Sequence, residues 1–274
     1  MSIFTRAFRR ESVQNYINAD SHMTRELTTR DLIGLGVGTV IGTGIFILPG
    51  HEAAQHAGPA VSVAFLIAAI FSGLSGMAFA EFSSAMPVAG SAYSYGSVIY
   101  GEIIGWLLGW SLILEYFLAV SAIATGFSAY FGNLLTIFGI HMPKSLMAGP
   151  LEGGVVNLFA VLIILVVTAI LSRGLSTSKK VENAAVVLKV AILGLFIIGG
   201  SFFIKHTNYV PFYPKEFHSG VFGLNGIWAA TASIIFAFLG FDTIAAHAAE
   251  VKNPQKTMAR GIIGTVLISA LLYV

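Results

Sequence analysis

The chain contains no cysteine, and this absence excludes two kinds of stabilisation at once. Neither a disulfide nor a metal site with thiolate ligands can form. The first 30 residues are polar and basic, and they contain neither the apolar core nor the small-residue cleavage site of a secretory signal peptide. We therefore expect no cleavable signal peptide.

Charge is also scarce. Charged residues make up 10% of the chain and hydrophobic residues 56%, whereas soluble domains carry roughly 25% charged residues. The sequence shows no basic stripe suited to nucleic acid, no metal-ligand spacing, no nucleophile–base motif and no phosphate loop. We therefore expect no enzyme, no cofactor, no metal and no nucleic-acid partner. An all-α polytopic protein in a lipid bilayer is expected instead.

Long apolar runs define the expected membrane spans, because a helix needs about 20 residues to cross a bilayer. The six predicted spans are Leu32–Leu48, Ala60–Ala85, Ile103–Ala129, Val155–Leu171, Ala184–Ile204 and Ile227–Ala249. A seventh run, Gly261–Val274, reaches only 14 residues when the chain stops. We therefore expect the N-terminal part of a longer protein, with helices 1–6 and part of 7.

Basic residues predict the orientation of the spans. Eleven lie on the side of the N-terminus: Arg6, Arg9, Arg10, Arg25, Arg30, Arg173, Lys179, Lys180, Lys252, Lys256 and Arg260. Three lie on the other side: Lys144, Lys205 and Lys215. Since cytoplasmic loops carry the excess of Lys and Arg, the N-terminus is predicted to be cytoplasmic.

Residues 1–30 form the predicted cytoplasmic N-terminal segment, which precedes a transmembrane domain of residues 31–274. Within the segment, Phe4, Phe8, Val13 and Ile17 fall near helical spacing. The segment therefore either lies along the membrane surface as an amphipathic helix or is a partly ordered tail.

The first predicted span is interrupted by Gly42-Thr43-Gly44-Ile45-Phe46. Two glycines in three residues let the backbone leave helical geometry at little cost. In a membrane such a break is tolerated only where it lines a cavity or is buried in protein. The half-helix expected to restart after Gly44 directs unpaired N–H groups, at the positive end of its dipole, into the gap. This arrangement predicts a receptor for a small carboxylate.

A second break is predicted in the sixth span, at Phe236-Ala237-Phe238-Leu239-Gly240-Phe241-Asp242. Gly240 permits the departure from the helix. Asp242 is expected first to cap the next half-helix, as its carboxylate accepts from N–H groups two or three residues on, and only second to act in a site. Paired interrupted helices in corresponding positions of two repeats indicate a transporter site near the bilayer midplane.

Two further ionisable residues inside predicted spans are candidates for function, since buried charges in membranes are costly. Lys189, in the fifth span, either extends to the headgroups or faces the first break and exchanges a proton, because burial lowers the pKa of a lysine. Glu115, in the third span, either makes a structural hydrogen bond or contacts the ammonium group of a substrate.

Taken together, these segments resemble the amino acid–polyamine–organocation permeases, and most of all the bacterial branch related to cationic amino acid transporters and branched-chain amino acid permeases. The resemblance is carried by Gly34–Pro49, Glu81–Tyr93, Gly109–Tyr116, Glu182-Asn183 leading to Lys189, and Phe236–Asp242 followed by Glu250–Pro254. It covers the chain from about residue 24 to its end. Singly these motifs are weak, and as a set they are specific.

The resemblance implies a five-plus-five inverted-repeat transporter fold, with the first repeat at about residues 31–204 and an incomplete second repeat at about 226–274. It implies that amides around Thr43, Gly44 and Ile45 hold the substrate carboxylate. Carbonyls near Val40 and Ile41, and near Phe236 and Leu239, hold the ammonium group. Phe236 resembles an aromatic gate over the site. Lys189 matches the lysine that replaces an ion site of sodium-coupled relatives, which implies proton coupling.

The functional hypothesis is therefore an amino acid importer of the cell membrane, multi-pass, driven by proton symport, with neutral or branched-chain amino acids favoured. The expected partners are the amino acid, protons and lipid. The expected substrate-binding residues are Val40, Ile41, Gly42, Thr43, Gly44, Ile45, Glu115, Phe236, Leu239 and Gly240. Two alternatives stay open: an amino acid exchanger of the same fold, and an inactive fragment or non-transporting membrane subunit.

Overall fold

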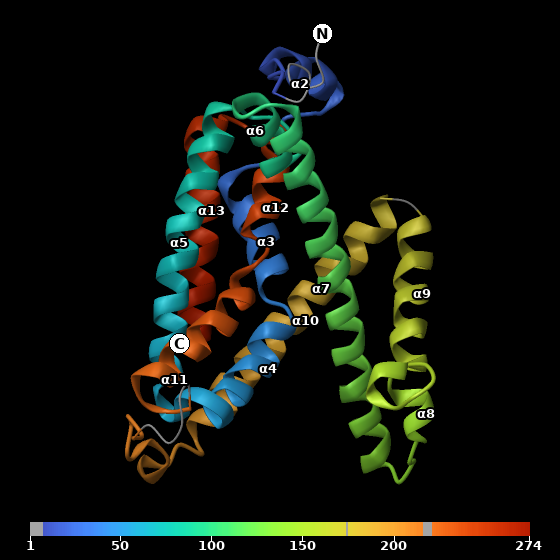
Figure 1. Ribbon diagram of the computed structural model, residues 1–274, viewed down its shortest axis with the longest axis vertical. Helices are drawn as coiled ribbons and strands as arrows, with labels where there is room; N and C mark the ends of the chain where they lie inside the picture. Colours follow the sequence, from blue (N-terminus) through green and yellow to red (C-terminus); the bar gives the residue numbers. More distant parts are fainter. Residues whose placement is uncertain (1–7, 174, 216–220) are drawn as a thin grey trace. The chain divides into compact units, whose positions relative to one another are not determined.

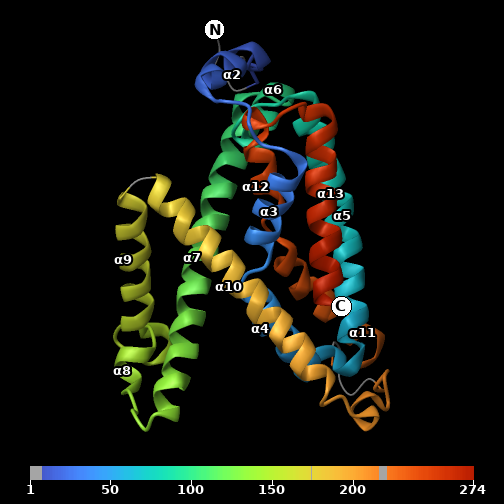
Figure 2. The ribbon, with the colours of Figure 1, turned by 180° about the vertical axis from the view of Figure 1, so that it is seen from behind.

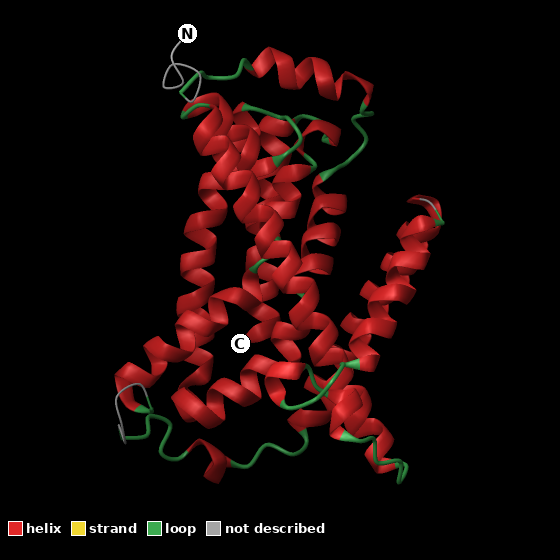
Figure 3. Ribbon diagram, turned by 45° about the vertical axis from the view of Figure 1, so that its right-hand side comes forward, coloured by secondary structure: helices red, strands yellow, loops and turns green. Residues whose placement is uncertain are grey.

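The computed structural model of the chain describes residues 8–173, 175–215 and 221–274 (Figure 1). Over these ranges the backbone is helical between loops and turns (Figure 3). Its β-pairing consists of an isolated bridge between Leu27 and Val251. Five helices of the described chain are long and apolar enough to cross a membrane. The predicted all-α, polytopic class is therefore confirmed.

The chain divides into two compact units, one of Met1–Trp110 with Leu195–Val274, and one of Ser111–Gly194. The helices of the first unit are α2 (Val13–Ala19), α3 (Thr29–Val40), α4 (Thr43–Glu52), α5 (Val61–Ala85), α6 (Ser91–Ile99), α11 (Gly223–Ile234), α12 (Phe241–Ala246) and α13 (Pro254–Tyr273). The second unit holds α8 (Lys144–Met147) and α9 (Leu158–Ser172). It also holds most of α7 (Glu102–Ile137) and α10 (Leu175–Ser201).

The core of the first unit forms where α13 packs on α5 and α3, and both ribbon views show α13 beside α5 (Figures 1 and 2). The face of α5 toward this core repeats small residues every four positions, and all of them are buried: Ala64, Ala68, Ser72, Gly76 and Ala80. Such a face lets two membrane helices approach closely. A Cβ atom on Gly76 would lie only 3.2 Å from Ile262.

Several helix boundaries differ from the ends of the predicted spans. The prediction for α5 was one residue early, whereas α7 continues to Ile137, eight residues beyond the predicted end at Ala129. The helix of the seventh run begins at Pro254 and not at Gly261, because proline is suited to the first turn of a helix. The first turns of α13 are polar, so an apolar run does not record them.

The described part of the N-terminal segment is ordered against the first unit. Its helix α2 begins only at Val13, where the Ser12 Oγ accepts a hydrogen bond from the N–H of Gln14 at 3.2 Å. Phe8 precedes this helix, and Phe4 lies outside the described residues. The helix is therefore shorter than the apolar spacing predicts. Tyr16 of α2 packs edge-on against Tyr93 of α6, with ring centroids 6.5 Å apart.

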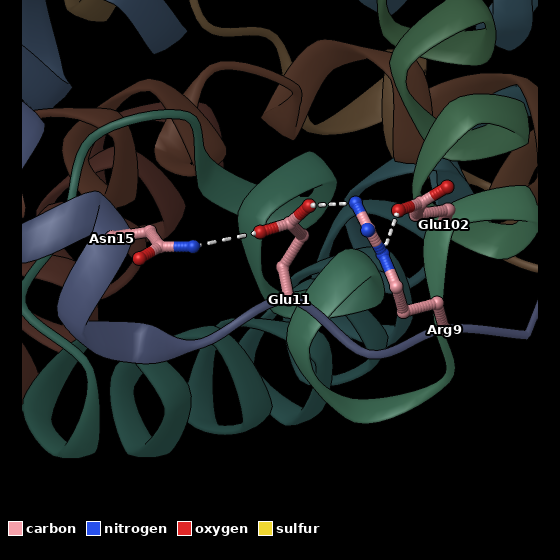
Figure 4. Close-up of polar contacts among 4 residues, drawn as sticks. All are labelled: Arg9, Glu11, Asn15 and Glu102. Atoms are coloured by element: carbon pink, nitrogen blue, oxygen red, sulfur yellow. Dashed lines mark hydrogen bonds and ion pairs between the residues drawn. The ribbon is translucent and has the colours of Figure 1, made fainter. Parts of the chain in front are cut away.

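Polar contacts fix this segment to the start of α7 (Figure 4). The Nε of Arg9 donates to the Oε1 of Glu102 at 2.7 Å, and the N–H of Glu102 donates to the carbonyl of Arg9 at 3.0 Å. Glu11 bonds Arg9 on one side, at 3.5 Å, and Asn15 on the other, at 3.1 Å (Figure 4). The segment thereby holds the short α6–α7 connection in place.

Candidate functional site

The first span is interrupted as predicted, but the break is shorter and lies earlier than the predicted Gly42–Phe46, because the helix restarts before Gly44. Helix α3 ends at Val40, and α4 begins at Thr43. Between them Ile41 has φ −71° and ψ 83°, and Gly42 is extended, with φ −115° and ψ −154°. Any residue can adopt an extended conformation, so the left-handed freedom of glycine is not what Gly42 contributes. As the residue preceding α4, it has no side chain with which to cap the first turn.

The second break is also confirmed. Helix α11 ends at Ile234 and passes through a 3₁₀ turn, Ile235–Phe238, before α12 begins at Phe241. Gly240 has φ +121°, a conformation that side-chain-bearing residues rarely adopt. A Cβ atom on Gly240 would also lie 3.2 Å from the backbone of Thr39. Glycine is therefore needed here twice, for the turn and for close packing.

The two breaks are in contact with each other. A Cβ atom on Gly44 would lie 3.0 Å from both the Cα and the Cβ of Ala237, so the start of α4 lies against the 3₁₀ turn of the second break. The hydroxyl oxygens of Thr39 and Thr243 lie 3.4 Å apart, and either can donate. Two interruptions that are far apart in the sequence therefore form one crossing, which we call the break crossing.

Tyr273 of α13 connects the two sides of the break crossing. Its hydroxyl lies 2.7 Å from the carbonyl oxygen of Val40 and 3.1 Å from that of Ala237. Its side chain is 6% exposed, and its ring packs against Phe65 and Phe238 at centroid distances of 5.8 and 5.0 Å. Sequence reasoning missed Tyr273. The available signal was its hydroxyl, which needs a partner when buried in an apolar helix.

The break crossing brings both kinds of backbone group together. The first N–H groups of any α-helix have no acceptor within that helix. In α4 these are the N–H groups of Thr43, Gly44 and Ile45. On the opposite side, the carbonyl of Val40 accepts from the N–H of Gly42 at 2.8 Å as well as from Tyr273. Such an arrangement places a positive helix end next to the negative ends of two others.

The predicted side chains around the break crossing differ in burial. Val40, Ile41 and Ile45 are buried, so they would contact a ligand through their backbone groups. Phe236 is 70% exposed and Leu239 is 37% exposed in the described chain. The side chain of Thr43 lies outside the described residues.

Asp242 lies at the second position of α12, and Gly240 occupies the N-cap position, which has no side chain to act as a cap. Asp242 is 7% exposed, and its backbone carbonyl accepts a hydrogen bond from Ser91 at 3.2 Å. A carboxylate in the first turn still stabilises a helix through the dipole. Its predicted role as a cap remains a prediction.

Glu115 and Lys189 both belong to the second unit, whereas the break crossing belongs to the first. Glu115 lies in the first half of α7, and Lys189 lies near the middle of α10. The helix α10 begins at Leu175, nine residues before the predicted span, so Lys189 is farther from its end than expected. The roles assigned to both residues from the sequence stay predictions.

These features define a class of protein: a multi-pass membrane protein with two interrupted helices that meet. A family model described as amino acid permease matches residues 27–274. The chain therefore belongs to the amino acid permease family, as the sequence motifs predicted.

Individual relatives share much of the chain. It is 47% identical over 268 residues to the branched-chain amino acid permease BcaP of Lactococcus lactis subsp. cremoris, covering 97% of this chain and 57% of that protein. It is 45% identical to the methylthioribose transporter of Bacillus subtilis, covering 92% of this chain and 54% of that protein. It is 38% identical to the vacuolar cationic amino acid transporter 2 of Arabidopsis thaliana, covering 98% and 43%. The chain spans about half the length of these relatives.

Proposed function

We propose that the whole protein containing this chain imports amino acids by proton symport and binds its substrate at the break crossing. The observation that carries this proposal is the contact of Gly44 with Ala237, which sets the N-terminus of α4 beside the last carbonyls of the second break. An α-amino acid presents a carboxylate and an ammonium group to any carrier. The two ends of the break crossing have the complementary polarity.

The carboxylate binds the amides of Thr43, Gly44 and Ile45, at the positive end of α4. The ammonium group binds carbonyls on the other side. The carbonyl of Val40 already accepts two hydrogen bonds within the chain. The carbonyl of its neighbour Ile41 therefore accepts more of the hydrogen bonds from the ammonium group. Gly42 and Gly240 keep both backbones open to the ligand.

Side chains complete the site. The exposed ring of Phe236 covers the bound substrate as a gate, with Leu239 beside it. Glu115 contacts the ammonium group directly or through water. Neutral or branched-chain amino acids are the favoured substrates, which agrees with the name of the Lactococcus lactis relative, a branched-chain amino acid permease. The amides of α4 recognise any α-carboxylate and do not separate valine from arginine.

Lys189 carries the coupled proton. Its amine takes up a proton when open to water and releases it when water is excluded, because a low-dielectric surrounding disfavours the charged form. In this proposal the protein lies in the cell membrane with its N-terminus in the cytoplasm. The excess of basic residues on the N-terminal side supports that orientation.

The test is uptake of a labelled amino acid panel into proteoliposomes with an imposed inward proton gradient. The whole protein is compared with its Lys189→Ala and Lys205→Ala variants, the second of which removes an exposed lysine just beyond α10. We expect gradient-driven uptake of neutral amino acids that Lys189→Ala abolishes and Lys205→Ala leaves intact. Trans-stimulated flux that ignores both the gradient and Lys189→Ala would establish the exchanger instead. Binding without any flux would leave only a non-transporting subunit.

A further inference from the structure

Two carbonyl groups with similar polarity converge at the break crossing. Val40 is the last residue of α3, and Ala237 lies in the 3₁₀ turn that follows α11. Both carbonyls stand at the negative ends of their helices. Bringing two such ends together in a water-poor interior is unfavourable unless a donor lies between them.

Tyr273 supplies that donor. Its hydroxyl is within hydrogen-bond distance of both carbonyl oxygens, at 2.7 and 3.1 Å. Its ring is held between Phe65 and Phe238, so the hydroxyl position is fixed by packing. Phe238 belongs to the same 3₁₀ turn as Ala237. Tyr273 of α13 therefore contacts the second break twice, through the ring of Phe238 and through the carbonyl of Ala237.

We propose that Tyr273 is a positioning residue, which ties α3 to the second break and so preforms the carbonyl side of the substrate site. This inference rests on the proposed function for its effect on substrate, but the tie itself is a property of the fold. With one hydroxyl proton shared by two acceptors, the tie holds the two helix ends together. Because each carbonyl oxygen has two lone pairs, that of Ala237 keeps one for an ammonium group, whereas Val40 also accepts from Gly42. Tyr273 itself is not assigned to the substrate.

The hydroxyl alone is removed by Tyr273→Phe, which keeps the aromatic packing. The matched control is Tyr95→Phe, at a buried tyrosine of α6 whose ring stacks on Phe82 at 5.5 Å. For amino acid uptake by the whole protein, we expect Tyr273→Phe to raise KM about tenfold, the factor for one lost hydrogen bond, with the maximal rate retained. Tyr95→Phe leaves KM unchanged. A purely structural role would instead lower the amount of folded protein at constant KM.

A second experiment tests the tie by disulfide cross-linking and needs no transport measurement. The chain has no cysteine of its own, so Thr39→Cys with Thr243→Cys places two thiols where hydroxyls lie 3.4 Å apart. A small shift brings such thiols to disulfide distance. We expect mild oxidation to link them rapidly, and expect Tyr273→Phe, but not Tyr95→Phe, to slow the reaction.

The outcomes separate the two proposals. If Tyr273→Phe slows cross-linking while the unmodified whole protein shows no uptake at all, the tie stands and the proposed function fails. If cross-linking proceeds at the same rate in both tyrosine variants, the tie is refuted, whatever the effect on KM.

Discussion

Gly44 lies tightly against Ala237: a Cβ atom on Gly44 would be 3.0 Å from the Cβ of Ala237, closer than almost all Cβ contacts in proteins. Gly44 is one residue into α4, and Ala237 lies in the 3₁₀ turn of the second break. The contact forces the two interruptions to share one place in the fold. It therefore accounts for a glycine at position 44 better than backbone flexibility does.

Gly44→Ala is expected to destabilise the protein by about 1–3 kcal/mol, the usual cost of inserting a methyl group into packed structure. The contacted atoms include the Cα of Ala237, which cannot move aside as a side-chain tip would. Gly50→Ala, in the same helix, is the control, because a Cβ there meets nothing within 4 Å. We expect it to be neutral or slightly stabilising. Thermal unfolding in detergent checks both, and equal midpoints for the two variants would contradict the close contact.

A hydrogen-bonded pair formed by the last residue of α4, Glu52, and His56 in the following turn makes a second prediction. Glu52 is 2% exposed, and its carboxylate lies 2.7 Å from the Nδ1 of His56. His56→Ala leaves this buried carboxylate without that partner, and an unpaired buried acceptor costs about 1–3 kcal/mol. His51→Ala, at the exposed neighbour of Glu52, is expected to change stability by less than about 0.5 kcal/mol. The measurement is the unfolding free energy of each variant, and similar losses for both would mean that the pair contributes nothing.

The capping box of α3 predicts a pH dependence. The Oδ2 of Asp31 accepts hydrogen bonds from the hydroxyl and the N–H of Thr28, at 2.6 and 2.8 Å. These bonds to Thr28 lower the pKa of Asp31. Because the folded-state pKa is depressed, the stabilisation is fully present above the ordinary pKa of about 4 and is lost as pH falls below it.

Asp31→Asn mimics the protonated carboxyl at every pH. We expect it to cost about 0.5 kcal/mol at neutral pH, the lower end for a cap because the site is exposed to solvent. The difference from the unmodified protein should vanish near pH 3. Denaturant unfolding of the two proteins from pH 7 to pH 3 checks this, and a difference that persists in acid would exclude the carboxylate as its source.

The two breaks could be predicted from local sequence. Gly42, Gly44 and Gly240 each mark a departure from helix within one span, without any need to know its neighbours. The apolar runs likewise located α5 to within one residue. The start of α13 at Pro254 escaped prediction, since its first two turns are polar and an apolar run does not record them.

Contacts between distant segments were out of reach. Nothing local indicates that the hydroxyl of Tyr273 meets the carbonyl of Val40, as 233 positions separate them. The same holds for Arg9 and Glu102, which lie 93 positions apart. Such pairs depend on how helices pack, and pattern and spacing within one element do not contain that information.

The most direct test of the account asks whether an amino acid occupies the first break. Gly42→Cys is suited to it, because a Cβ at Gly42 meets nothing closer than 3.9 Å and its φ is negative. Gly50→Cys, in α4 and open for 4 Å around, is the control. Each single-cysteine variant, as the reconstituted whole protein, is treated with a thiol reagent with and without valine. If the substrate binds at the first break, saturating valine blocks the reaction of the Gly42→Cys variant and leaves the rate of the Gly50→Cys variant unchanged. Equal rates for the Gly42→Cys variant with and without a transported amino acid would contradict binding at the break crossing.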